Sequence, residues 1–169
     1  MSYKKGFSLI EVLVYIAVMV IVLLIVVNTA LLMTKAYQEM RLSVNMNNSA
    51  VSILERMSRE ARWSSSINTT DSILNNNSGL LVLNRIDGSE VTTEIRFYIE
   101  NGSLVIKEGL SDAVALNAPG KVFVDKFFVT RIDSGISEMV KIEIELRGML
   151  KDRIKMETFY DSIILRESY

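Results

Sequence analysis

A long apolar run near the N-terminus constrains this chain more than any other feature of its sequence. Residues 12–27 are all apolar or aromatic, and before them only Ser8 and Glu11 interrupt the run, which begins at Phe7. A membrane-spanning helix needs about 20 mostly apolar residues, so the run is long enough to cross a bilayer. Because residues 7–63 contain neither proline nor glycine, one helix could extend for roughly 80 Å.

The residues that flank the run suggest its orientation in a membrane. Lys4 and Lys5 precede it, and basic residues tend to stay in the cytoplasm, so the N-terminus is expected inside and the remainder exported. A cleaved secretory signal peptide has a shorter apolar core and a small-residue cleavage site, but this run is long and Asn28 stands at its best exit. A plain signal anchor explains the lysines and the length, but leaves Glu11 and the placement of Gly6 unexplained.

A third interpretation comes from the string GFSLIEVLV at residues 6–14, which follows a short basic leader. The combination resembles the N-terminal signature of type IV prepilins and type II secretion pseudopilins. The resemblance implies that a prepilin peptidase cuts between Gly6 and Phe7 on the cytoplasmic side, after which Phe7 is N-methylated. It also implies three partners besides membrane lipid: the peptidase, other pilins or pseudopilins in a hetero-oligomeric filament, and an inner-membrane assembly platform.

The carboxylate of Glu11 fits this resemblance. A charge at the centre of a membrane helix costs about 2.5–3.5 kcal/mol, and Glu11, near the cytoplasmic end, would cost less but still be unfavourable. Cutting after Gly6 would free the α-amine of Phe7, which is positive near neutral pH. The resemblance implies that the glutamate of an incoming subunit pairs with this amine on a neighbour and sets the axial register. Snorkelling of Glu11 to headgroups, or pairing with its own N-terminus, stays open as an alternative.

Residues 35–63 are expected to continue the helix outside the lipid with an apolar face against a sheet. The apolar positions predicted to share that face are Met40, Val44, Val51, Leu54 and Ala61, widened by Ile53 and Met57. The charged positions predicted to lie mostly on the other side are Glu55, Arg56, Arg59, Glu60 and Arg62. Trp63, at the end of the helix, is expected to be a core or boundary anchor.

The rest of the chain carries strand and turn signals. Residues 64–79 are expected to form a loop, Asn101-Gly102 a hairpin turn, residues 111–120 an irregular loop, and residues 138–147 the clearest half-buried antiparallel strand. The ending is expected to form strand material at residues 154–160 and again at 162–165.

A helix followed only by strands predicts an α+β fold, in which the long N-terminal helix packs on an antiparallel sheet. This is the pilin-like architecture, with the first half of the helix in the membrane. Residues 97–105 and 163–166 also resemble the larger J-type pseudopilins and PilW-like minor pilins. Many major pilins carry a proline midway along the apolar helix, whereas this chain has Asn28-Thr29 there. That departure favours a minor subunit.

Composition narrows the possible chemistry. The chain lacks histidine and cysteine, and its formal net charge is −1. These values argue against an enzyme, a thiolate or histidine metal site, and nucleic-acid binding. The paired Glu143 and Glu145 are expected on a solvated strand face, and residues 71–79 do not match a calcium-binding loop spacing. We expect no catalytic residues, no metal and no cofactor.

The sequence therefore predicts a non-enzymatic minor pilin or pseudopilin of the bacterial inner membrane, acting in filament initiation or at the tip for type II secretion, pilus biogenesis or DNA uptake (competence). Its predicted segments are a cleaved cytoplasmic leader (residues 1–6), a transmembrane half-helix (7–34), an amphipathic half-helix (35–63) and a periplasmic or extracellular sheet domain (64–169). The alternative is a single-pass membrane-anchored binding domain that does not polymerise.

Overall fold

The computed structural model describes residues 8–86, 91–118, 120–134, 137–150 and 153–165. The chain divides into two compact units, Met1–Met40 and Arg41–Tyr169, and each unit is described by itself. Helix α1 (Leu9–Arg62) supplies all the regular structure of the described part of the first unit, and its remaining residues begin the second unit.

Helix α1 confirms the predicted long helix and is continuous over 54 residues. In the first unit its large apolar side chains are 45–80% exposed, and the segment is long and apolar enough to cross a membrane. The helix does not break at Asn28 and Thr29. Instead the Thr29 hydroxyl donates a hydrogen bond to the carbonyl oxygen of Ile25 at 2.8 Å, which satisfies this polar side chain within the helix itself.

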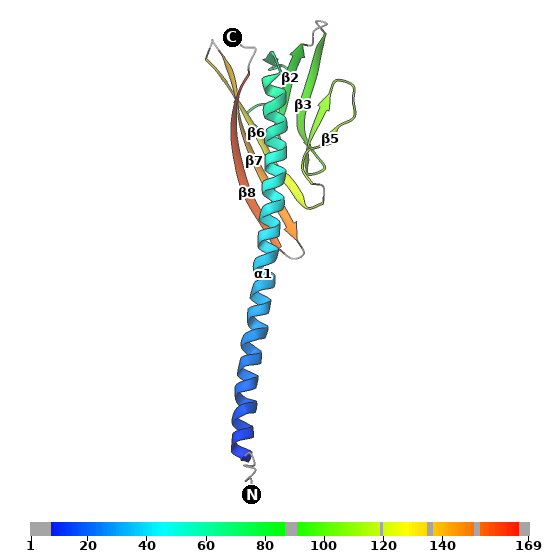
Figure 1. The fold of residues 1–169 in the computed structure, drawn as a ribbon. Helices are drawn as coiled ribbons and strands as arrows, with labels where there is room; N and C mark the ends of the chain where they lie inside the picture. The colour runs from blue at the N-terminus through cyan, green and yellow to red at the C-terminus, as the bar shows by residue number, and fades with distance from the viewer. Residues whose placement is uncertain (1–7, 87–90, 119, 135–136, 151–152, 166–169) are drawn as a thin grey trace. The chain divides into compact units, whose positions relative to one another are not determined.

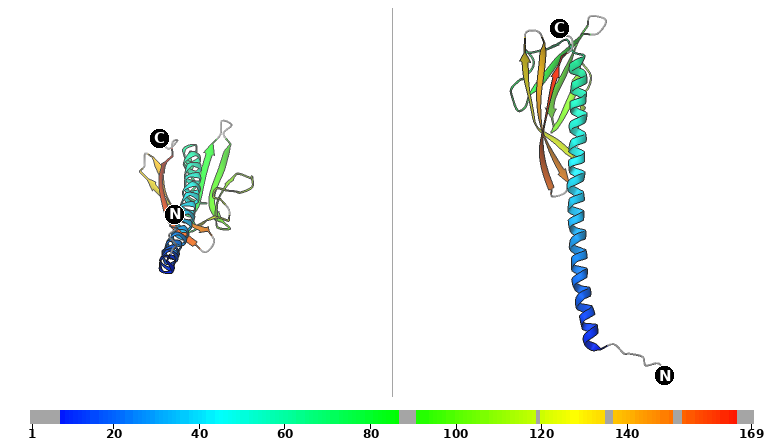
Figure 2. Two further views of the ribbon diagram at one scale, coloured as in Figure 1. Left: turned by 60° about the horizontal axis from the view of Figure 1, so that its bottom comes forward. Right: turned by 60° about the vertical axis from the view of Figure 1, so that its left-hand side comes forward.

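In its described residues the second unit contains two antiparallel sheets, where the sequence predicted one. The strands of the first sheet, in spatial order, are β1 (Ser66–Ile67), β2 (Leu80–Ile86), β3 (Thr92–Glu100), β4 (Ser103–Glu108) and β5 (Val114–Ala115). The strands of the second are β6 (Val122–Asp133), β7 (Glu138–Leu150) and β8 (Arg153–Ile164). Figure 1 and the left view of Figure 2 show the part of α1 in this unit between β8 and the first sheet. The α+β class of a helix packed on antiparallel strands is confirmed.

The β3–β4 hairpin was predicted correctly at its turn. Glu100 pairs with Ser103, and the two residues between them, Asn101 and Gly102, have φ angles of 50° and 72°. Positive φ at both central positions is the requirement of a type I′ turn, whose twist matches that of the flanking strands. This explains why Asn-Gly occurs here.

Short and terminal strands were predicted less well. The expected loop at residues 64–79 contains β1, the expected loop at 111–120 contains β5, and the two expected pieces at the end are one strand, β8. Strands β1 and β5 have two residues each and exist through pairing with β2 and β4. Because that pairing is set by distant residues, no local pattern announces it. Residue 166 lies outside the described residues.

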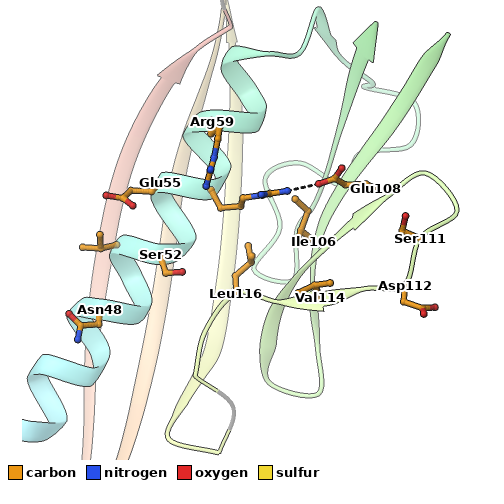
Figure 3. A pocket seen from close by; sticks show the side chains of 12 residues that line it. Asn48, Ser52, Glu55, Arg59, Ile106, Glu108, Ser111, Asp112, Val114 and Leu116 are labelled. Carbon is orange, nitrogen blue, oxygen red and sulfur yellow. Dashed lines mark hydrogen bonds and ion pairs between the residues drawn. The ribbon is translucent and has the colours of Figure 1, made fainter. Parts of the chain in front are cut away.

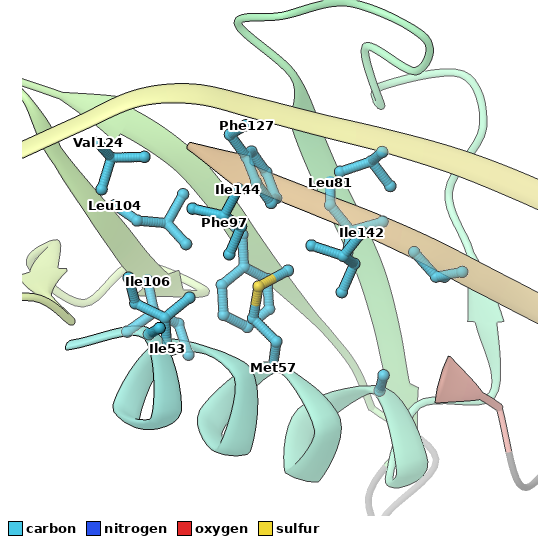
Figure 4. Close-up of a cluster of buried hydrophobic side chains, with 14 of the residues drawn as sticks. Ile53, Met57, Leu81, Phe97, Leu104, Ile106, Val124, Phe127, Ile142 and Ile144 are labelled. Carbon is cyan, nitrogen blue, oxygen red and sulfur yellow. The ribbon is translucent and has the colours of Figure 1, made fainter. Parts of the chain in front are cut away.

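The core lies between the C-terminal part of α1 and the inner faces of both sheets. In Figure 4, Ile53 and Met57 of α1 face Phe97 of β3 and Ile142 and Ile144 of β7, and all five side chains are fully buried. The alternation predicted for β7 is confirmed, since its inward positions are all 0% exposed; they are Val140, Ile142, Ile144 and Leu146.

The face of α1 that packs on the sheets differs in part from the predicted one. Ile53, Met57 and Ala61 are buried as expected, and Leu54 packs on the core while half-buried. The prediction was wrong for three positions that are 49–59% exposed, namely Met40, Val44 and Val51. The positions buried in their place are Leu42, Met46, Ser49, Ala50 and Glu60. Apolar residues occur on two sides of this helix, so periodicity alone did not choose between them. Trp63 is 59% exposed, which makes it a boundary residue and not a core residue.

Gly148 of β7 allows the helix to approach the second sheet closely. A Cβ atom at this position would lie 2.7 Å from Leu42 Cδ1 and 2.7 Å from Met46 Sδ, well inside the usual carbon contact of about 3.5–4.0 Å. We expect Gly148→Val to destabilise the second unit by about 1–3 kcal/mol through overpacking. Urea unfolding of the detergent-solubilised chain, followed by circular dichroism, would measure this. Lys141→Val, at an exposed position of the same strand, is the control, and equal midpoints for the two variants would contradict the expectation.

Candidate functional site

The sequence-predicted site residues fall in and before the first turn of α1. Lys4, Lys5, Gly6 and Phe7 lie outside the described residues, so their predicted roles as basic leader, cleavage site and methylation site remain predictions. Glu11 is described and stands in the first turn of α1. A carboxylate at this end of a helix interacts favourably with the helix dipole.

Glu11 has a side-chain partner that the sequence interpretation missed. The Tyr15 hydroxyl donates a hydrogen bond to Glu11 Oε1 at 3.0 Å. Residues four apart lie on the same side of a helix, and long side chains lean towards its N-terminus, so the phenol of Tyr15 reaches back to the carboxylate. The i, i+4 spacing of a carboxylate and a tyrosine in an otherwise apolar run was the signal that could have revealed this contact.

The second unit holds a closed ring of four charges between the helix and the first sheet. Arg56 Nε and Arg85 Nη1 each lie 3.0 Å from a carboxylate oxygen of Glu60. The same two guanidinium groups also reach Glu108, Arg85 at 3.4 Å and Arg56 more closely. The Glu60 side chain is only 3% exposed, which corrects its expected place on the solvent side. Two positive and two negative charges compensate one another here, so the ring joins α1, β2 and β4 without a net buried charge.

A groove of about 750 Å³ runs beside this ring, between α1 and the β4–β5 segment. Figure 3 shows Ser52 of α1 across from Val114 and Leu116, with Glu108 at the edge of the groove. The walls combine apolar side chains with charges of both signs.

The predicted solvated face of β7 carries ion pairs to β6. Lys126 Nζ donates to Glu143 Oε1 at 2.7 Å, and Arg147 Nε donates to Asp125 Oδ2 at 2.6 Å. The hydrogen bond from Lys126 to Glu143 raises the pKa of Lys126. A raised lysine pKa contributes stability at every pH below the ordinary lysine value and loses it only as the pH rises through the folded value. Lys126 therefore stays charged throughout the neutral range.

The asparagine-rich segment after α1 is organised by its own hydrogen bonds. Asn68 Oδ1 accepts hydrogen bonds from the backbone N–H groups of Thr70 and Asp71, both at 3.2 Å, and Asn68 Nδ2 donates to Asp71 Oδ2 at 3.0 Å. This is an Asx-type turn, in which the amide and carboxylate stabilise the loop. Within the described ranges, no three carboxylates gather closely enough to hold a metal ion.

Comparison with known proteins bears on the N-terminal segment. A family model described as the prokaryotic N-terminal methylation motif matches residues 1–27. No curated protein and no solved structure matched the chain. The match covers the predicted leader, Gly6, Phe7 and Glu11, and extends into the apolar part of α1. Together with the long apolar helix, it fits a protein anchored in the inner membrane. The motif supports a type IV pilin-like precursor that is processed by a prepilin peptidase.

Proposed function

We propose that this chain is a minor pilin or pseudopilin, a structural and non-enzymatic subunit of a bacterial type IV pilus-like filament. The observation that carries the proposal is the methylation motif at residues 1–27, joined to a helix that continues unbroken to Arg62. Its expected place is the initiation or the tip of a filament that serves type II secretion, pilus biogenesis or DNA uptake. Helix α1 is continuous at Asn28 and Thr29, and no proline occurs there. Because many major pilins carry a proline at this place, its absence favours a minor subunit.

The proposed mechanism begins with processing. The peptidase removes residues 1–6 on the cytoplasmic side, and the new N-terminal residue, Phe7, is methylated. Residues 7–34 then hold the subunit in the inner membrane, with the N-terminus in the cytoplasm and residues 64–169 outside. Assembly transfers the apolar helix from lipid into a bundle of like helices. There Glu11 pairs with the Phe7 amine of a neighbouring subunit, while the assembly platform drives the transfer.

The pairing of Glu11 with that amine follows from the cost of an isolated charge. A buried carboxylate is tolerated when a partner charge compensates it. The Tyr15 hydroxyl supplies one hydrogen bond but no positive charge. A neighbour's amine would supply the charge, so docking is favoured where the two groups meet.

The second candidate is a membrane-anchored binding domain that never polymerises. The groove between α1 and the β4–β5 segment is the observation that favours it, since it offers a mixed apolar and charged surface to a partner. The two candidates predict different fates for the mature chain. A filament subunit enters the fraction that is sheared from cells, whereas an anchored module stays entirely with the membrane.

Mass spectrometry of the membrane-extracted chain tests the processing step. In cells with an active prepilin peptidase, we expect residues 1–6 to be absent and Phe7 to carry one added methyl group. Cells that lack the peptidase should retain the intact N-terminus and serve as the control. A full-length, unmethylated chain in cells that process another prepilin would contradict the proposal.

A further inference from the structure

We propose that Tyr15 is a positioning residue for Glu11, which orients and solvates the carboxylate in the membrane before a neighbouring subunit supplies a positive charge. This inference rests on the proposed function, because it concerns the step in which Glu11 docks. It assigns a role to a second residue of the apolar helix and to one hydrogen bond, from Tyr15 Oη to Glu11 Oε1 at 3.0 Å.

The composition of the helix makes this contact conspicuous. Among residues 12–27, Tyr15 is the single residue whose side chain carries a hydrogen-bond donor. It stands four positions after Glu11, where its hydroxyl reaches the carboxylate. One or two positions after Glu11 a tyrosine would not face the carboxylate, because only residues three or four apart are neighbours on a helix surface. The single side-chain hydrogen-bond donor of residues 12–27, the Tyr15 hydroxyl, therefore binds the carboxylate of Glu11.

The depth of the two residues explains what the contact does. Tyr15 lies about 6 Å further along the helix axis than Glu11, at a rise of about 1.5 Å per residue. Its ring is therefore on the lipid side of the carboxylate, and its hydroxyl points back towards the membrane surface. An amphipathic tyrosine suits such a place, because its ring stays in the apolar layer while its hydroxyl meets a polar group.

The hydrogen-bond donor of Tyr15 is a neutral phenol, and its lack of charge is part of the proposed role. A phenol is neutral, so it replaces part of the lost hydration of the carboxylate without cancelling its charge. A lysine or arginine in its place would complete an ion pair within the subunit and would remove the demand for a neighbour's amine. Tyr15 holds one carboxylate oxygen, Oε1, and we infer that this fixes the direction in which the carboxylate meets the incoming amine.

A double-mutant cycle separates this role from simple packing. The variants are Tyr15→Phe, Glu11→Gln and the two combined, with Tyr37→Phe as the control because Tyr37 is an exposed tyrosine later in the same helix. For each we would measure the ratio of mature chain in the sheared filament fraction to mature chain in the membrane. Mass spectrometry would confirm equal processing, so differences in the ratio report assembly and not maturation.

We expect Tyr15→Phe to lower the ratio of sheared to membrane-bound chain when Glu11 is present, but not in the Glu11→Gln variant. Hydrogen bonds to charged groups are worth more than those between neutral groups, so Tyr15→Phe should lower the ratio by about tenfold, and Tyr37→Phe by less than about twofold. In the Glu11→Gln background, Tyr15→Phe should change the ratio by less than about twofold, because the charge through which it acts is gone.

Three outcomes would overturn the positioning role of Tyr15. They differ in whether the docking role of Glu11 is also contradicted. If Tyr15→Phe assembles normally while Glu11→Gln does not, Tyr15 has no positioning role and the role of Glu11 stands. If Tyr15→Phe lowers assembly equally in both backgrounds, its hydroxyl acts elsewhere. If Glu11→Gln itself assembles normally, both the positioning role and the docking role of Glu11 are wrong, while processing at Gly6 is untouched.

Discussion

Glu11→Ala is expected to be processed and inserted normally, yet to lose most of its incorporation into filaments. Removing a carboxylate from an apolar run makes membrane insertion more favourable, so the variant should reach the inner membrane at least as well as the parent chain. Docking is expected to suffer because the amine of a neighbour loses its partner. Leaving one member of a buried ion pair uncompensated costs about 3–5 kcal/mol, which predicts at least about a hundredfold loss at equilibrium.

The ratio of sheared to membrane-bound chain would measure this loss, with mass spectrometry of the N-terminus as a check on processing. Glu39→Ala is the matched control, since Glu39 is an exposed carboxylate later in the same helix. We expect this control to assemble within about twofold of the parent chain. Normal incorporation of Glu11→Ala would remove the docking role of the carboxylate. Loss of processing in the variant would instead point to recognition of Glu11 by the peptidase.

The second large effect is expected at the ring of four charges in the second unit, formed by Arg56, Glu60, Arg85 and Glu108. Glu60→Ala removes one carboxylate and leaves Arg56 and Arg85 to share Glu108. Breaking a buried pair by removing one partner typically costs about 3–5 kcal/mol. Because the arginine side chains keep 33% and 27% exposure to water, which screens part of the imbalance, we expect about 3 kcal/mol. The unfolding midpoint of the solubilised chain in urea, followed by circular dichroism, would report it.

Glu55→Ala is the control for the ring, because Glu55 is an exposed glutamate one turn earlier on α1. Substitutions at such surface positions usually stay within about 0.5 kcal/mol. Adding Arg85→Ala to Glu60→Ala should cost less than the sum of the two single changes, since the remaining Arg56 and Glu108 can then compensate each other. Equal losses for Glu55→Ala and Glu60→Ala would show that the ring contributes nothing specific.

Local signals predicted several elements of the fold correctly. The absence of proline and glycine from residues 7–63 predicted α1, and Asn101-Gly102 predicted the β3–β4 turn. The alternation of β7 predicted which of its side chains are buried. In each case the physical cause acts within a few residues, through backbone hydrogen bonding, positive φ or the two-residue period of a strand.

Other features depended on residues far apart in the chain. The face of α1 around Val44 and Val51 was predicted to be buried and is exposed, because apolar residues occur on two sides of this helix. Strand β8 was expected as two pieces and is continuous through its pairing with β7. The division into two sheets likewise follows from which strands pair, and pairing between distant segments leaves no local periodicity to detect.

For the candidate site, the N-terminal string predicted a methylation motif, and the family model at residues 1–27 supports that prediction. The hydrogen bond from Tyr15 to Glu11 was not predicted, although its cause is local, because a tyrosine in an apolar run also suits a membrane-facing position on its own. The burial of Glu60 was missed for a different reason. A glutamate is expected in water unless it is paired, and its partner Arg85 is 25 residues away in the chain.

The sequence by itself determined the long apolar helix, the motif before it and the location of one charge within it, since all three depend on neighbouring residues. Only the tertiary structure decided which side of α1 is buried, how the strands divide into two sheets, and that Glu60 belongs inside. Those outcomes depend on how surfaces from distant segments fit together, and on the compensation of the buried Glu60 charge by Arg85, which the chain supplies from β2.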